Sequence, residues 1–261
     1  MNLLIAPFVN ALFGFYYWLG NFGWAIVLVT LVIRLILLPL LWPSLKSAKK
    51  IRDVQPKLNK LKEKYGTNKQ ALAQAQMALY KEEGINPLSG CLPQILQIVV
   101  LLVFFSAFNL VTGFSGSGKK GSVEEINAQL ISSFKIEEGF DFDLNFLGSD
   151  LSMSPSKIFS QGISVDLVLP LILLLGSGVL QFLSAKMMMP AAKIGETVAE
   201  KTKKDKEDDM MSAMRTQSLY MMPAMTILIG WNFSMGLLLY WFTTSALMMG
   251  QQVLVNKVNK K

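Results

Sequence analysis

The sequence has 261 residues, of which 52% are hydrophobic and 16% are charged, whereas soluble domains carry about 25% charged residues. It contains no histidine and one cysteine, which excludes Ser-His-Asp and Cys-His catalysis, histidine-containing zinc sites and an internal disulfide. The formal net charge is +7 and the mean hydropathy is +0.40; this composition indicates a membrane protein with apolar runs of about 20 residues.

The first 20 residues are apolar and uncharged, and they lack the basic segment and cleavage site of a secretory signal peptide. If they crossed the membrane, residues 21–23 alone would join two spans. Tyr16, Tyr17 and Trp18 are instead typical of a membrane–water interface. We therefore expect residues 1–20 to form an amphipathic helix on the outer surface, although a span is the alternative, and residues 21–261 to form the membrane core.

Five apolar runs follow that are candidate membrane spans. The fourth has only 15 residues, about 22 Å of helix against a hydrocarbon core of about 30 Å, so it must thin the membrane or lean on a neighbour. A tight turn at residues 232–234 predicts that the last two spans form an antiparallel hairpin. The five runs are residues 24–42, 92–112, 167–185, 219–233 and 235–255.

The connections between these runs differ in charge, and basic residues mark the cytoplasmic side. Residues 43–91 hold ten basic and four acidic residues, whereas residues 113–166 hold four basic and eight acidic residues. Residues 186–218 hold seven basic residues, and the C-terminal tail is basic. We therefore expect the N-terminus outside and the C-terminus in the cytoplasm of a multi-pass plasma-membrane protein.

The first cytoplasmic connection, residues 44–83, has the composition and apolar spacing of two helices. Gly66 is placed to stop the first helix, Thr67 or Asn68 to cap the second, and Pro56 marks a kink or a fresh helix start. The sequence thus predicts a helical hairpin. Its charges form either a solvated face or a platform for anionic headgroups, nascent chain or ribosomal RNA. The external connection contains a Gly-Ser-Lys linker at residues 113–121, and its remainder carries no motif.

Arg34 is the eleventh residue of the first span, roughly 15 Å deep at 1.5 Å per residue. A central arginine costs about 2.5–3.5 kcal/mol on insertion scales, and no Asp or Glu lies inside any span to pair with it. Snorkelling to the cytoplasm would have to cover about 12 Å of helix, more than the side chain reaches. The sequence therefore predicts a water-filled cavity around Arg34.

Uncharged polar residues on the spans are candidates to line that cavity. A cation among neutral polar groups is a site for something anionic, and without a second titratable group it is not an acid–base site. Neither a metal nor a cofactor is expected. The candidates are Thr30, Gln94, Gln97, Ser106, Gln181, Ser184, Thr226, Thr243, Thr244 and Gln252, of which we select Thr30, Gln94, Gln97, Gln181 and Gln252 together with Arg34.

The order and spacing of several strings across the spans resemble the YidC family of membrane protein insertases. They include Gly-Trp-Ala-Ile at 23–26 before Thr-Leu-Val-Ile-Arg at 30–34, Asn-Pro-Leu-Ser-Gly-Cys-Leu-Pro at 86–93, Gly-Val-Leu-Gln-Phe at 178–182 and Tyr-Trp at 240–241. The resemblance implies that Arg34 is the groove arginine, and that Leu101, Tyr240 and Trp241 belong to an apolar slide for the leaving substrate helix. It also implies that the cytoplasmic hairpin is mobile and receives substrates.

Residues and resemblance together predict an all-α membrane protein: a five-span helical bundle with a cytoplasmic helical hairpin and an N-terminal interfacial helix. The expected function is a non-enzymatic, ATP-independent insertase and chaperone, since the sequence has no Gly-rich ATP-binding loop. Its partners would be nascent membrane proteins and the lipid bilayer, with the Sec translocon and the ribosome as further candidates and no role for DNA. The alternative is an anion channel or small-solute transporter that uses Arg34 as its binding charge.

Overall fold

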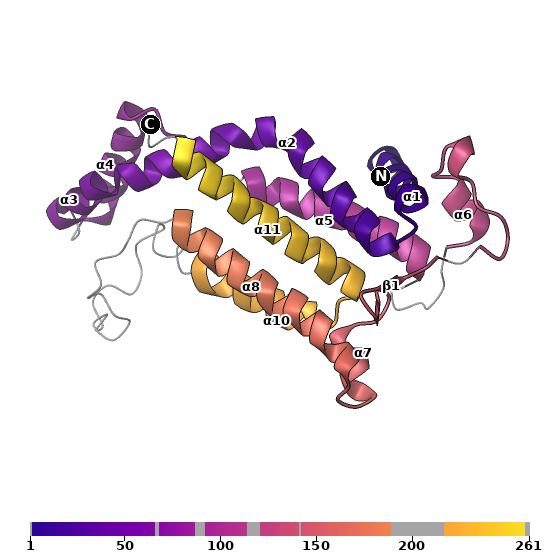
Figure 1. Ribbon diagram of the computed structural model, residues 1–261. Coiled ribbons are helices and arrows are strands. Elements are labelled where there is room, and N and C mark those ends of the chain that lie inside the picture. The colour runs from indigo at the N-terminus through magenta and orange to yellow at the C-terminus, as the bar shows by residue number, and fades with distance from the viewer. Residues whose placement is uncertain are drawn as a thin grey trace.

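The all-α membrane class is confirmed: the computed structural model is mostly helical (Figure 1). Within its described residues, three helices are long and apolar enough to cross a membrane, at Phe22–Asp53, Pro93–Thr112 and Val165–Met187. The structure describes residues 2–65, 68–86, 92–113, 121–140, 142–188 and 217–258. Cys91 and most of the connection at 186–218 therefore lie outside the described residues.

Four long helices run along one bundle axis (Figure 1). They are α2 (Phe22–Asp53), α5 (Leu92–Thr112), α8 (Val168–Met188) and α11 (Met235–Val258). Asn21 caps the start of α2, because its side-chain oxygen accepts hydrogen bonds from the backbone N–H groups of Gly23 and Trp24. The helix continues eleven residues past the expected end at Trp42, because it bends rather than stops at Pro39 and Pro43 (Figure 1).

The predicted fourth span is short and irregular. A π-helical turn, η4 (Gln217–Met221), leads into α10 (Met222–Gly230), and the two together measure about 21 Å at 1.5 Å per residue. A turn at Trp231 and Asn232 leads to α11 as expected. However, α10 and α11 each pack against α8 rather than mainly against each other. The predicted two-helix hairpin is therefore separated by α8.

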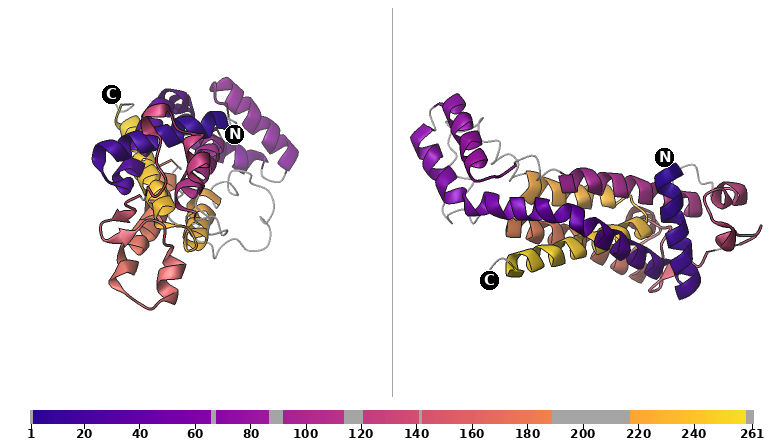
Figure 2. Two further views of the ribbon diagram at one scale, coloured as in Figure 1. Left: turned by 90° about the vertical axis from the view of Figure 1, so that its right-hand side faces the viewer. Right: turned by 90° about the horizontal axis from the view of Figure 1, so that it is seen from above.

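The N-terminal helix α1 (Asn2–Leu19) lies across the end of the bundle (Figure 2). It packs on α2 and α5 through its buried Phe8, Val9, Leu12 and Phe13, while Trp18 is exposed. Asn10 fixes it to the external segment, because its side-chain amide donates to the Gln129 carbonyl at 2.6 Å and its oxygen accepts from the Ile131 N–H at 2.7 Å. Its axis crosses the direction of the long helices (Figure 2).

The connection that the sequence predicts to be cytoplasmic contains a helical pair, α3 (Gln55–Tyr65) and α4 (Lys69–Glu82), next to the end of α2. Asn68 caps α4 by accepting the Ala71 N–H. The pair has its own small core, separate from the core of the bundle, and Lys57 is joined to Glu83 by an ion pair. That core consists of Val54, Leu58, Leu79, Tyr80 and Ile85.

The segment that the sequence predicts to be external, called the external segment below, forms several short elements in its described residues. It contains α6 (Val123–Asn127), η2 (Ser132–Phe134), the antiparallel strand pair β1 (Asn145–Phe146) and β2 (Ser149–Asp150), α7 (Pro155–Ser160) and η3 (Val165–Leu167). The strands are absent from the all-α prediction. They are too short for a period-two pattern, and the positive φ values of Leu147 and Gly148 form their turn.

This segment covers one end of the bundle by contacting both α2 and α11. At Gly23 of α2, an added Cβ would lie 2.1 Å from the Phe146 ring, so the ring occupies the space that glycine leaves. The N–H groups of Met235 and Gly236, at the start of α11, donate to the carbonyls of Met153 and Leu151 at 2.7 and 2.9 Å.

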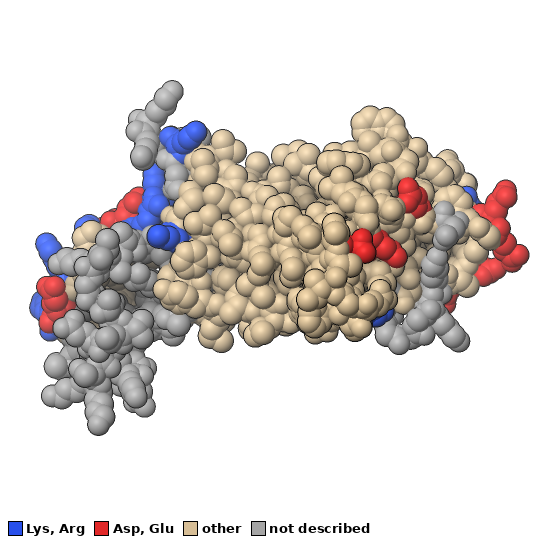
Figure 3. All heavy atoms as spheres, turned by 60° about the horizontal axis from the view of Figure 1, so that its bottom comes forward, with Lys and Arg blue, Asp and Glu red and all other residues tan. Residues whose placement is uncertain are grey.

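Charged side chains gather at the two ends of the molecule. On the face in Figure 3, a belt without Lys, Arg, Asp or Glu separates a mixed, largely basic end from an acidic one. The first end carries the α3–α4 pair, and the second carries the external segment. The belt matches the part of the bundle that the apolar runs predict to lie in lipid.

Candidate functional site

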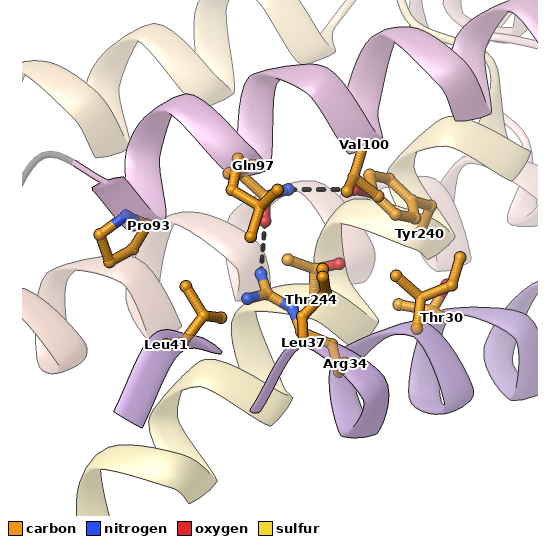
Figure 4. Close-up of a pocket in the computed structure, with 11 residues that line it drawn as sticks. Thr30, Arg34, Leu37, Leu41, Pro93, Gln97, Val100, Tyr240 and Thr244 are labelled. Atoms are coloured by element: carbon orange, nitrogen blue, oxygen red, sulfur yellow. Dashed lines mark hydrogen bonds between the residues drawn. The ribbon is translucent and has the colours of Figure 1, made fainter. Parts of the chain in front are cut away.

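Arg34 projects from α2 into the bundle and is 7% exposed. Its guanidinium donates a hydrogen bond to the side-chain oxygen of Gln97 on α5. The amide nitrogen of Gln97 donates in turn to the Tyr240 hydroxyl on α11 at 3.0 Å. Three helices that are far apart in sequence are therefore joined by one polar chain (Figure 4).

The positive charge of Arg34 is met by neutral groups. In the described part of the chain, no ion pair joins it to a carboxylate. A guanidinium has five N–H donors in a planar fork that suits carboxylate or phosphate. The site therefore offers binding capacity for an anion, and nothing in it provides a paired general acid and base.

A narrow pocket surrounds the guanidinium (Figure 4). Its interior of about 10 Å³ has room for about one water molecule, and the hydrated cavity around Arg34 stays a prediction. Besides Arg34, the lining residues are Thr30, Ile33, Leu37 and Leu41 from α2, Pro93, Leu96, Gln97 and Val100 from α5, and Tyr240 and Thr244 from α11.

The position of Tyr240 is fixed by aromatic packing. Its ring stacks on Phe104 with centroids 4.5 Å apart and an interplanar angle of 14°. Phe104 stacks in turn on Phe108 at 5.8 Å and meets Phe8 of α1 edge-on at 5.6 Å. Since Tyr240 is 1% exposed, this aromatic column determines where its hydroxyl meets Gln97.

Of the selected polar residues, Thr30, Arg34 and Gln97 line the pocket. The Thr30 hydroxyl donates to the Ile26 carbonyl of its own helix at 2.7 Å, which satisfies its donor. Gln94 is exposed on α5 because it lies about 100° around the helix from the pocket residue Pro93, beyond the edge of the pocket-facing side. It is not part of the pocket.

The other two selected glutamines also lie outside the pocket. Gln181 of α8 accepts from the Thr226 hydroxyl of α10 at 2.9 Å, which joins those two helices by a polar contact. Gln252 is buried on α11, about two turns beyond Thr244. The sequence could not separate these positions, because it does not show which helices are neighbours.

The three residues assigned to an apolar slide have different neighbours in the structure, and the slide stays a prediction. Tyr240 lines the pocket, whereas the Trp241 ring lies 5.7 Å from Phe233 near the α10–α11 turn. Leu101 packs against the bundle core next to the pocket residue Val100. The apolar wall formed by Leu37, Leu41 and Pro93 was not predicted. For the two leucines of α2, helical spacing from Arg34 was the signal that could have placed them on the same face as the arginine.

The family model described as "60Kd inner membrane protein" matches residues 14–261. A Clostridium tetani protein named "Membrane protein insertase YidC" is 30% identical over 92% of this chain and 84% of its own length. Proteins of the same name from Pelobacter propionicus and Streptomyces avermitilis are 28% and 31% identical over 98% and 91% of this chain.

The chain spans 39% of the Pelobacter protein and 52% of the Streptomyces protein. The residues matched by the family model, 14–261, include α2, α5 and α11, which build the Arg34 site. Since the family model itself covers all but the first 13 residues, the chain belongs to the 60Kd inner membrane protein family, the YidC family, and is a multi-pass membrane protein.

Proposed function

We propose that this protein is a membrane protein insertase and chaperone that moves short polar segments of nascent chains into the plasma membrane without ATP hydrolysis. The observation that carries the proposal is Arg34, a buried cation in a membrane-length apolar helix whose described partner is the neutral Gln97. The names of the relatives support the same function.

Entry of a substrate requires an exchange of partners at Arg34. In the closed pocket the guanidinium is bound to the Gln97 oxygen. When α2 and α5 separate, water enters and a carboxylate from the substrate replaces that oxygen. At 4 Å and an effective dielectric constant near 20, the attraction is about 4 kcal/mol before desolvation, comparable with the insertion cost of one charge.

The short η4–α10 span supports transfer, because a span of about 21 Å beside full-length spans favours a locally thinner membrane. The substrate leaves when its own apolar helix is buried in lipid. This step requires no covalent chemistry and no bound nucleotide.

The proposal includes a membrane arrangement. The spans are α2, α5, α8, η4–α10 and α11, with the N-terminus outside and the C-terminus in the cytoplasm, and α1 lies in the outer interface. Its crossing direction and exposed Trp18 support this position (Figure 2). Nascent chains and lipid are the partners, the α3–α4 pair receives substrates, and the Sec translocon and the ribosome are candidates for docking there.

The test compares acidic-tailed and neutral-tailed versions of one substrate, inserted into vesicles that contain equal amounts of each variant. Arg34→Lys keeps a cation but loses bidentate geometry, so we expect it to retain much of the activity. Arg34→Ala slows the acidic tail more than the neutral tail, and Arg34→Glu slows it further because attraction becomes repulsion.

Equal losses for both tails would remove charge recruitment from the mechanism, and no loss for either would remove Arg34 from it. An anion flux through protein-containing vesicles that disappears in Arg34→Ala, without any effect on insertion, would favour the channel alternative.

A further inference from the structure

The external segment presents an apolar tip that the Arg34 mechanism does not use. We define the outer tip as Phe159 at the end of α7, Ile163 in the following turn and Val165 at the start of η3. Ile163 is 87% exposed and Val165 is 84% exposed, the highest values among large apolar side chains in the described residues. Phe159 is 52% exposed.

The tip is held in a defined position. Ile158 and Leu167, on either side of it, are buried. The Ser156 N–H donates to the Trp231 carbonyl at 3.0 Å, and the Phe159 and Trp231 rings lie 5.8 Å apart. The apolar side chains are therefore presented on a segment fixed to the outer end of α10.

The tip continues an apolar stripe on α8. That helix exposes large apolar side chains at spacings of three and four residues, which places them on one face. The stripe begins three residues after Val165. Its side chains are exposed on the surface of the bundle, where a membrane-spanning helix contacts lipid. Its residues are Val168, Ile172, Leu175, Val179 and Leu183.

The tip also lies at the same end of the bundle as α1. Two views show α7 and the following turn on the side of the bundle opposite α1, next to the outer ends of α8 and α10 (Figures 1 and 2). The acidic residues of the external segment end the uncharged belt at this level (Figure 3).

From this continuity we infer that the outer tip is a second interfacial anchor, inserted among the headgroups and upper acyl chains of the outer leaflet. Phe159, Ile163 and Val165 would contact phospholipid directly, and the molecule would be held in the outer interface on both sides, by α1 and by the tip. This inference concerns lipid contact and does not depend on insertase activity.

The test places one environment-sensitive fluorophore on single cysteines in a Cys91→Ser background. The full chain is reconstituted in vesicles of phosphatidylethanolamine and phosphatidylglycerol. Labels at Ile163→Cys and Val165→Cys report the tip. Ile172→Cys, on the α8 stripe, is the deeper reference, and Ala128→Cys, an exposed position at the end of α6, is the aqueous reference.

We expect blue-shifted emission at both tip positions and protection from aqueous iodide. Quenching there should be several-fold stronger by a nitroxide near the glycerol end of the acyl chain than by one near its methyl end, whereas Ile172→Cys shifts toward the deeper quencher. Adding Ile163→Asp to the Val165→Cys chain should abolish lipid quenching and leave thermal unfolding in detergent unchanged, since the side chain is exposed.

Tip labels that behave like Ala128→Cys would place the tip in water and overturn the inference. Blue-shifted tip labels that no lipid nitroxide quenches would place the tip against protein, which would overturn it equally.

Discussion

Arg34 depends on a single neutral side chain in the closed pocket. Replacing Gln97 by Leu removes the oxygen that accepts from the guanidinium and leaves a buried donor unsatisfied. We expect Gln97→Leu to lower the free energy of unfolding by about 1–3 kcal/mol, measured by denaturation in lipid bicelles. Gln94→Leu, on the exposed side of the same helix, is the matched control and should change stability by less than about 0.5 kcal/mol. Equal effects would show that the hydrogen bond contributes nothing.

At the other end of the polar chain, removing the Tyr240 hydroxyl should lower the free energy of unfolding by a smaller amount. Tyr240→Phe removes the hydroxyl that accepts from Gln97 but keeps the ring stacked on Phe104. The expected loss is about 0.5–1.5 kcal/mol. In a double-mutant cycle with Gln97→Leu the losses should not add, because both changes remove the same bond. Additive losses would mean that the two side chains act independently.

At the scale of elements, the start of α11 is packed so closely against α5 that an added methyl group would clash. A Cβ at Gly236 would lie 2.3 Å from the Phe108 ring, whereas one at Gly250 on the same helix meets nothing within 4 Å. Gly236→Ala should therefore destabilise the protein by about 1–3 kcal/mol through overpacking, and Gly250→Ala should stabilise it by about 0.5–1 kcal/mol. Thermal unfolding of the two variants measures the contrast, and the same sign for both would contradict it.

The α3–α4 pair should open independently of the bundle, because its core is separate. Leu58 is 2% exposed in that core, and Leu58→Ala removes about 2–5 kcal/mol of packing locally. Hydrogen exchange should become faster in α3 and α4 and remain unchanged in α2 and α11. Met77→Ala, at a 56% exposed position of α4, is the control. Faster exchange throughout the bundle would show that the pair is structurally required.

The ion pair on this element adds a pH dependence. The hydrogen bond to Glu83, and then its negative charge, raise the pKa of the Lys57 amine. The stabilisation is fully present below the ordinary lysine pKa and is lost as the pH rises through the higher value in the folded pair.

For the whole molecule, the charge asymmetry predicts topology. In a Cys91→Ser background, single cysteines at Lys60 or Lys257 should react with an impermeant reagent only from the cytoplasmic side, and a cysteine at Glu138 only from outside. The positions are exposed at the basic and acidic ends of the bundle. External labelling at Lys60 would reverse the arrangement.

Much of this architecture follows from local signals in the sequence. Apolar run length indicates α2, α5 and α8, the cap at Asn68 is visible in the sequence, and the central position of Arg34 identifies the site. What could not be predicted depends on helix neighbours. Gln94 and Gln97 are equivalent by composition, and rotation of α5 alone decides that Gln97 reaches Arg34. The position of α8 between α10 and α11 likewise has no local signal.

The polar chain through Arg34, Gln97 and Tyr240 also determines at which stage of synthesis the pocket can be completed. Since chains are made from the N-terminus, α2 and α5 emerge long before α11 supplies Tyr240. Until then the arginine and the glutamine lack their third partner, and the aromatic column lacks its final ring. A newly made molecule therefore acquires a complete pocket only when α11 has entered the bilayer, so a chain truncated before α11 should be an inactive product and not a partly working one.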